Sequence, residues 1–282
     1  MANQQCRRDC TTGINCCMTS NPCLNGGICL PPSSNSQKRF RCKCPDGYEG
    51  KRCHVMKCSP GYSGKSCEQP IKSCRGYGNG SRVPGNYTLI DGDLRPFQVL
   101  CDFDTNSSMT WTLILSYKLK YKIEFIRTPL SANSPKNQNE PSWSRYRLSK
   151  SAMESIQKDS VQWRLTCRYE TDGVVYTDYL RALNKEANIL TFMGNGKCVK
   201  MEFINIRGQS CIACTARFWQ RLDNILHTDS FHTHNCEFKP VGSLRCIGQG
   251  EDNFGYYNCI NIKHRCTSSE EATTQTWFGG GD

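Results

Sequence analysis

The sequence predicts a small disulfide-rich β module followed by a larger mixed α+β domain that is rich in strands. The first observation is the cysteine count, since 21 cysteines among 282 residues favour an oxidising compartment in which disulfides persist. The second is a dense run of cysteines and glycines in residues 16–54, a segment too short to bury a sufficient core. The third is a series of short apolar stretches with strand-like alternation beyond residue 74.

Residues 1–15 are interpreted as the remnant of an upstream cysteine-containing region. Residues 6–67 contain 11 cysteines, an odd number that cannot pair within itself, whereas residues 74–266 contain 10. We therefore expect that a lost upstream segment supplied a cysteine partner and the signal peptide, with one free or intermolecular thiol as the alternative. Cys6, Cys10 and Cys16 have no assigned role in this interpretation.

Residues 16–54 carry the most specific motif of the chain. It begins with Asn21-Pro-Cys23-Leu-Asn-Gly-Gly-Ile-Cys29 and continues with Cys42-Lys-Cys44-Pro-Asp-Gly-Tyr-Glu-Gly-Lys-Arg-Cys53. This pattern resembles an EGF-like module. The resemblance implies the disulfides Cys17–Cys29, Cys23–Cys42 and Cys44–Cys53, with Cys16 competing for the place of Cys17. The acidic residues of calcium-binding versions are missing, so we expect a structural or adhesive spacer.

Residues 55–73 repeat the end of that module and then form a linker. Cys58-Ser-Pro-Gly-Tyr-Ser-Gly-Lys-Ser-Cys67 keeps both cysteines, both glycines, the tyrosine and the lysine of residues 44–53. We interpret it as a partial EGF-like repeat with a Cys58–Cys67 disulfide. Residues 1–73 also carry 11 Lys and Arg against 4 Asp and Glu, although a solvated cationic surface explains that charge as well as an anionic partner does.

The segment 74–282 is expected to form the larger domain. Ser73-Cys74, Gly85-Asn-Tyr-Thr-Leu-Ile, Phe97-Gln-Val-Leu-Cys101-Asp-Phe and Trp111-Thr-Leu-Ile follow one another. This series resembles the opening of fibrinogen-related domains, and the match thins beyond it. The resemblance implies a divergent fibrinogen-like, lectin-like domain with a Cys74–Cys101 disulfide. The pairing of the remaining cysteines stays open for Cys167, Cys198, Cys211, Cys214, Cys236, Cys246, Cys259 and Cys266.

Local patterns predict several elements within this domain. Apolar and charged residues alternate strictly in residues 117–125, which predicts a strand with Lys118, Lys120 and Lys122 on one face. These lysines could bind sulfated glycan or protect the edge of a sheet. A capping pattern at residues 151–154 predicts the start of a short helix. Residues 161–169, 174–179 and 199–206 are predicted to be strands, and residues 131–142 a loop.

Two segments near the end of the chain are candidate ligand-binding regions. Asp229 lies just ahead of Asn235-Cys236, where it could belong to a remnant calcium site, although His232 and His234 are poor calcium ligands. With His227 these histidines could instead hold zinc, or form a solvated loop. Asp252, Asn253, Tyr256 and Tyr257 combine acids and aromatics as sugar-binding pockets do, with packing as the alternative.

The stretch from Cys211 to His232 has the C-x2-C-x12-H-x4-H spacing of a nucleic-acid-binding zinc finger. Two arginines and two aspartates leave it without net charge, whereas a DNA-reading finger brings positive charge to the phosphates. Apolar residues 218, 219, 222, 225 and 226 fall at helical spacing. We therefore expect a disulfide-tethered helix, and a zinc-dependent nucleic-acid binder is the least favoured alternative.

The function expected from the sequence is extracellular recognition or adhesion. The larger domain would bind a glycan or a matrix protein, with the EGF-like module as spacer; a purely structural matrix component is the alternative. The N-x-S/T sequons at Asn79, Asn86 and Asn106 predict glycosylation. Catalytic motifs are missing, as is an apolar run of about 18–20 residues, so we expect no enzyme, no cofactor and no membrane span.

Overall fold

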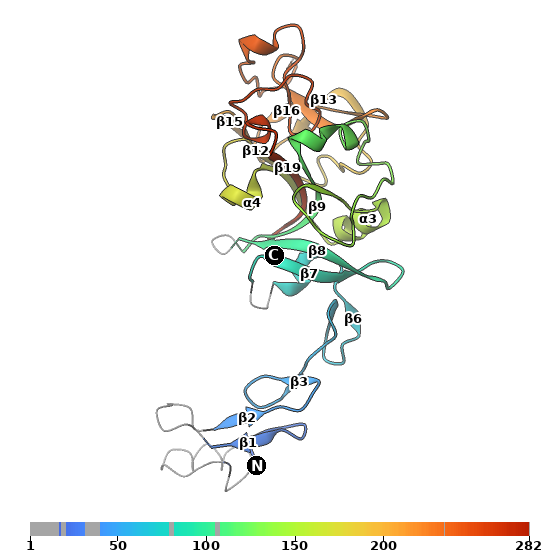
Figure 1. Cartoon of the computed structure of the whole chain (residues 1–282), viewed down its shortest axis with the longest axis vertical. Coiled ribbons are helices and arrows are strands. Elements are labelled where there is room, and N and C mark those ends of the chain that lie inside the picture. Colours follow the sequence, from blue (N-terminus) through green and yellow to red (C-terminus); the bar gives the residue numbers. More distant parts are fainter. Residues whose placement is uncertain are drawn as a thin grey trace. The chain divides into compact units, whose positions relative to one another are not determined.

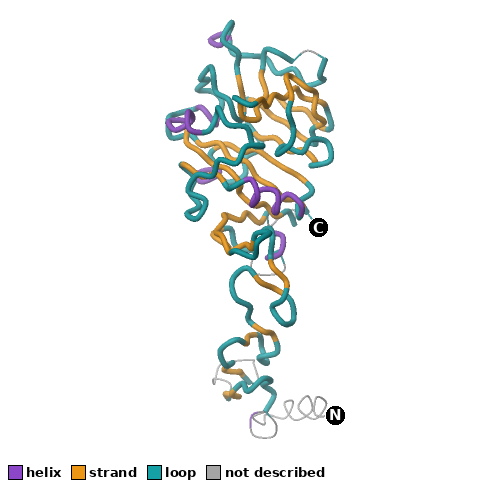
Figure 2. The backbone as a smooth tube through the Cα atoms, turned by 90° about the vertical axis from the view of Figure 1, so that its right-hand side faces the viewer, coloured by secondary structure: helices purple, strands orange, loops and turns teal. Residues whose placement is uncertain are grey.

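The computed structural model describes residues 17, 21–31, 40–78, 82–104, 108–233 and 235–281. It forms two compact units that divide between Pro70 and Ile71, and each is described by itself. Ile71 belongs to the larger unit because its side chain is 5% exposed within that unit's core and its carbonyl accepts from the Ile90 amide. Strands account for most of the regular structure, with short helical segments between them (Figure 2).

The first unit is built from short antiparallel strand pairs held by disulfides (Figure 1). The pairs are β1 (Ile28–Leu30) with β2 (Arg41–Lys43), β3 (Tyr48–Glu49) with β4 (Val55–Met56), and β5 (Tyr62–Ser63) with β6 (Gln69–Pro70). Its disulfides are Cys17–Cys29, Cys23–Cys42, Cys44–Cys53 and Cys58–Cys67, the pairs that the EGF-like resemblance implies.

The β5–β6 hairpin of this unit repeats the β3–β4 hairpin in three dimensions. Tyr48 pairs with Met56 in one hairpin, and Tyr62 pairs with Pro70 at the same place in the next. Gly50 and Gly64 adopt φ angles of 90° and 94°, the left-handed region in which glycine is preferred. The internal repeat of the sequence is therefore also a repeat of backbone conformation.

The larger unit contains a nine-stranded antiparallel sheet in the order β15-β14-β12-β11-β19-β9-β8-β7, with β10 beside β9. Its strands are β7 (Gly85–Ile90), β8 (Pro96–Phe103), β9 (Thr110–Lys118), β10 (Arg145–Arg147), β11 (Gln162–Cys167), β12 (Tyr179–Leu183), β14 (Phe203–Ile206), β15 (Gln209–Ile212) and β19 (Thr273–Gly280). The helices are α3 (Lys150–Lys158) and α4 (Tyr169–Asp172), and the 3-10 turns are η1 (Cys74–Tyr77), η2 (Leu119–Glu124), η3 (Leu244–Cys246) and η4 (Arg265–Thr267).

A second sheet of four antiparallel strands has the order β13-β16-β17-β18. Its strands are β13 (Gly194–Lys200), β16 (Thr215–Arg221), β17 (Asn224–Asp229) and β18 (Asp252–Asn253). The chain passes from this sheet to the larger one at Met201 and Glu202. The Met201 amide donates to Cys214, whereas the Glu202 amide donates to Arg181 of β12.

The centre of the larger unit contains a buried arginine. Arg164 of β11 lies with its Nη2 atom 2.6 Å from the Oδ2 atom of Asp102, and both side chains are almost fully buried. Its guanidinium lies 4.4 Å from the Trp111 ring and 4.7 Å from the Trp277 ring. A planar guanidinium can satisfy a carboxylate and two aromatic faces at once. Asp102 therefore forms an ion pair with Arg164 in the core, and Trp111 packs against the guanidinium.

The expected strand at residues 117–125 is wrong beyond Lys118. The chain turns into η2, and the Leu119 and Lys120 amides donate to carbonyls of Ala272 and Glu270. The turn brings the Phe125 ring over Tyr117, with centroids 4.9 Å apart. The alternating pattern therefore does not reflect strand pairing beyond Lys118, and Ile123, one of its apolar residues, is 65% exposed.

The expected helix between Cys211 and His232 is also wrong, because this segment forms the β16–β17 hairpin. Residues 174–178 form no strand and lead into β12, which begins at Tyr179, so the expected strand at 174–179 is wrong apart from its last residue. Residues 199–206 belong to two strands in different sheets. The cap of the short helix lies two residues before the expected one, since the Ser149 Oγ atom accepts from the Ala152 amide. The loop at residues 131–142 and the strand at β11 agree with expectation.

Candidate functional site

One face of the four-stranded sheet carries an open hollow of about 620 Å³. Residues directly opposite one another in antiparallel strands share a face, and so do residues two apart along a strand. Trp219 lies opposite His227, and Asp229 lies opposite Asp252. These four side chains therefore line one face, while Phe218 and Thr228 lie on the other face, where Phe218 belongs to the core.

An arginine-rich wall comes from β16. Arg217, Trp219 and Arg221 all line the hollow. The Arg217 guanidinium lies 5.1 Å from the Trp219 ring and donates to the carbonyls of Gly196 and His232, at 2.8 and 3.1 Å. The Arg221 Nη2 atom donates to the Asn195 side chain. The wall therefore presents two guanidinium groups, one of them held by three neighbours.

Aromatic rings cross the middle of the hollow. The Trp219 and His227 rings are stacked with centroids 5.9 Å apart, and the Tyr256 ring lies 5.4 Å from His227. The His227 Nδ1 atom lies 2.7 Å from the carbonyl of Ile225, so this nitrogen carries the proton. Burial lowers the pKa of His227 to about 4, so the ring is neutral near pH 7.

The opposite wall is acidic. Asp229 and Asp252 lie directly across from each other in β17 and β18, and their side chains are 8% and 10% exposed. Burial, together with the charge of Asp229, raises the pKa of Asp252 to about 7. The Asp252 Oδ1 atom faces the unprotonated Nε2 atom of His227 at 3.4 Å. Asp229 accepts from the Phe231 amide and lies 2.5 Å from the His232 ring nitrogen.

Two disulfides fix the loops that surround the hollow. Cys198–Cys236 joins β13 to the segment after β17, which supplies His232 to the wall. Cys246–Cys259 closes the loop that carries residues 248–258 of the wall. A loop restrained at both ends loses less conformational freedom when a ligand binds. The hollow therefore has the rigid frame that a binding site requires.

Three of the five expected ligand residues line this hollow and two do not. Asp229, Asp252 and Tyr256 face it, whereas Asn253 is 1% exposed and pairs with Thr228 on the other side of the sheet. Tyr257 is buried, and its hydroxyl lies 2.6 Å from the Thr274 hydroxyl in the core. The expectation for Asn253 is wrong because neighbours in a strand point to opposite faces. Tyr257 follows β18 outside any strand, and its ring packs in the core.

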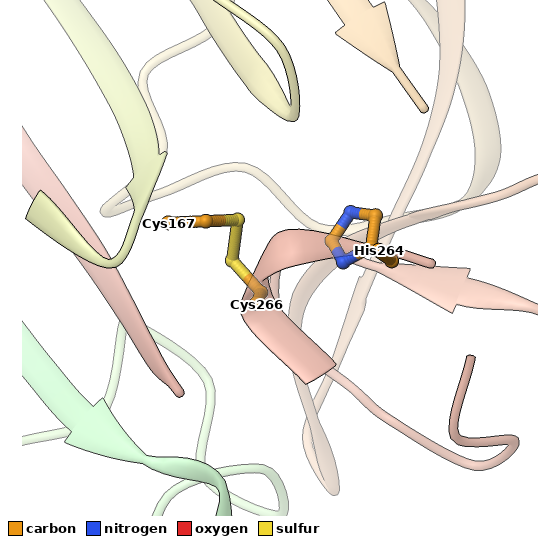
Figure 3. Close-up of side chains that lie close together, drawn as sticks. All are labelled: Cys167, His264 and Cys266. Atoms are coloured by element: carbon orange, nitrogen blue, oxygen red, sulfur yellow. A yellow bond between two sulfur atoms is a disulfide. The ribbon is translucent and has the colours of Figure 1, made fainter. Parts of the chain in front are cut away.

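The zinc-finger alternative is contradicted by the pairing of its cysteines. Cys211 and Cys214 are joined in a disulfide, so neither sulfur is a thiolate that could bind zinc. Cys167, His264 and Cys266 also come together within the described residues, yet the two sulfurs are bonded to each other (Figure 3). His234 of the expected histidine cluster lies outside the described residues.

Few groups near Asp229 are suitable ligands for calcium, which is the alternative expected from the sequence. Both oxygens of this carboxylate are engaged, one by the Phe231 amide and the other by His232. Calcium requires six to eight oxygen ligands, and His227 and His232 supply nitrogen. The residues present at this end of the hollow do not form a calcium site.

The expected lysine face at residues 118–122 is also wrong. Lys118 and Lys120 both pair with Glu271, and the Lys122 ammonium donates to the carbonyl of Tyr257 at 2.8 Å. The three ammonium groups are therefore engaged by groups of the same unit. Among the sequons, Asn86 is exposed on β7, whereas Asn79 and Asn106 lie outside the described residues, as do Cys6, Cys10 and Cys16.

Sequence reasoning missed the arginine-rich wall. Arg217, Trp219 and Arg221 alternate, which is a strand signal, but the apolar spacing of the same segment favoured a helix. The register of β16 against β17 also shifts between Trp219 and Arg221, and the sequence pattern does not predict this irregularity. A turn signal at the exposed Leu222-Asp223 would have been the better guide.

Comparison with known proteins concerns the first unit. A family model described as EGF-like domain matches residues 17–52. Protein jagged-1 of Homo sapiens is 43% identical over 42 residues, which is 15% of this chain and 3% of that protein. Protein jagged-1b of Danio rerio is 45% identical over 40 residues, 14% of this chain and 3% of that protein.

None of the described helices is both long and apolar enough to span a bilayer. Residues 17–52 are an EGF-like domain, and with the disulfides this points to an extracellular protein.

Proposed function

We propose that the protein is an extracellular adhesion protein whose larger unit binds glycan in the hollow on the four-stranded sheet. The observation that carries the proposal is the row of rings formed by Trp219, His227 and Tyr256, which lies between two charged walls. Aromatic faces pack against the C–H surfaces of a sugar, and polar groups fix its orientation. The volume of about 620 Å³ lies in the range of small-molecule sites, roughly 300–1,000 Å³.

The acidic wall complements sugar hydroxyls. Asp229, Asp252 and the exposed Asn258 offer carboxylate and amide groups that can accept or donate hydrogen bonds. The proposed activity is binding, with no bond made or broken. The EGF-like domain and the partial repeat act as a spacer in this proposal, and the fibrinogen-like character of residues 74–282 is part of it.

Binding to immobilised glycans, with competition by free sugar, tests the proposal. We expect Tyr256→Ala to weaken binding about tenfold, because an aromatic contact is worth on the order of 1 kcal/mol. Tyr176→Ala is the matched control: this tyrosine is 53% exposed and lies outside the hollow, so the variant should bind normally. Adhesion to matrix protein without competition by any sugar would instead favour a structural matrix component.

A further inference from the structure

The hollow separates positive from negative charge across its width. Arg217 and Arg221 belong to β16, whereas Asp252 belongs to β18, and β17 lies between these strands. Neighbouring strands lie about 4.8 Å apart, so Asp252 lies about 10 Å from the strand of the two arginines, whereas Asp229, on β17, lies one strand away from it. The rings of Trp219 and His227 cover the floor between them.

The two arginines are not neutralised by the protein. Within the part of the chain that the structure describes, no carboxylate lies within ion-pair distance of Arg217 or Arg221, whereas Arg164 and Arg207 each pair with one. The contacts of Arg217 with the carbonyls of Gly196 and His232 hold its side chain in place without cancelling its charge. Such a held guanidinium is prepared to receive an anion, because little side-chain freedom remains to be lost.

We propose that the sugar bound in this hollow carries one anionic group, a carboxylate or a sulfate, and that this group lies against Arg217 and Arg221. The inference rests on the proposed glycan binding and specifies its ligand class. The neutral part of the sugar covers Trp219, and its hydroxyls face Asp229 and Asp252. The acidic wall disfavours a polyanion, since a second negative group at that end would meet Asp229. The site therefore selects a singly charged acidic sugar.

Titration calorimetry on the full chain with matched sugars tests this inference. The probes are a neutral oligosaccharide, the same oligosaccharide ending in a uronic or sialic acid, and its sulfated form. We expect at least one acidic form to bind about tenfold or more tightly than the neutral form, the order expected for a charge-assisted hydrogen bond. The carboxylated and sulfated arms identify which anion is used.

The variants separate charge recognition from folding. Arg217→Gln with Arg221→Gln should abolish the preference for the acidic sugar, so that the neutral and acidic forms bind with equal affinity. Binding of the neutral form by this variant would show that the hollow is still folded. If the double variant fails to fold, Arg221→Gln alone serves instead, because this side chain is exposed. The single variant should reduce the preference for the acidic sugar. Arg127→Gln removes an exposed arginine elsewhere and should change nothing.

Two results would overturn the inference. Equal affinity of the wild-type chain for neutral and acidic sugars would refute the anionic ligand and leave glycan binding standing. Absence of binding to every sugar would refute the proposed function together with this inference.

Discussion

Asp252 is placed where a charged carboxylate is unfavourable. It lies opposite Asp229 in adjacent strands, and like charges at such positions destabilise a sheet. Its pKa of about 7 follows from burial and from that neighbour. A proton on Asp252 would point to the free nitrogen of His227, which is 3.4 Å away. The stability of this end of the hollow should therefore depend on pH.

Replacing Asp252 with Asn should remove that dependence. The pKa of Asp252 is about 7 in the folded chain and 3.8 in the unfolded chain. The stabilisation of the folded chain by protonated Asp252 is therefore complete below pH 4 and is lost as the pH rises to 7. Asp252→Asn should thus gain stability relative to wild type between pH 4 and pH 7, by at most about 4 kcal/mol. Urea unfolding at several pH values measures the difference.

The control for this experiment is the exposed Asp223 in the β16–β17 turn. Asp223→Asn should give a curve parallel to that of the wild type. Parallel curves for Asp252→Asn as well would show that its carboxyl group does not couple to folding.

At the scale of elements, the sequence indicated several residues that line the hollow, although the elements expected around them were partly wrong. The acidic and aromatic residues at 252–257 predict a pocket, whereas the sequence places Asp229 in an expected remnant calcium site ahead of Asn235-Cys236. The β16–β17 hairpin was missed because Phe218, Trp219 and Leu222 have helical spacing by coincidence of a bulge and a turn. Strand pairing is decided by partners far along the chain, and local periodicity carries no information about them.

Two disulfides of the larger unit should contribute differently to sugar binding and to stability. Cys246–Cys259 spans 13 residues and closes the loop of the hollow, whereas Cys167–Cys266 spans 99 residues and lies in the core. Chain-entropy arguments assign about 3 kcal/mol to a short loop and nearer 5 kcal/mol to a long one. Cys246→Ser with Cys259→Ser should therefore weaken sugar binding at least tenfold while costing less stability than Cys167→Ala with Cys266→Ala.

Calorimetry for binding and urea unfolding for stability would measure both effects. We expect the second double variant to bind sugar normally as long as it remains folded. Unchanged sugar affinity in the first double variant would contradict the assignment of the 246–259 loop to the binding site.

At the scale of the whole molecule, the two units differ in how far local sequence determines them. The EGF-like domain is specified by cysteine spacing over 36 residues, so its motif could be recognised directly. In the larger unit, β19 lies between β9 and β11, which precede it by more than 100 residues. No sequence pattern indicated Thr273–Gly280 as a strand, since its buried threonines and glycines are not a strongly apolar run.

This arrangement predicts what truncation does. A chain that begins at Ile71 keeps both sheets of the larger unit and should bind sugar with the affinity of the full chain. A chain that stops at Ala272 loses β19 and should fail to fold. Circular dichroism and calorimetry would decide, and loss of binding in the first chain would mean that the EGF-like unit contributes to the site.

The central place of β19 also bears on how the protein is made. The nine-stranded sheet cannot close until the residues up to Gly280 have left the ribosome. Until then β9 and β11 expose unpaired edges with apolar side chains, which are prone to join other chains. Synthesis of this unit should consequently depend on chaperones that shield the incomplete sheet, because wrong disulfides and aggregates would form before β19 is added.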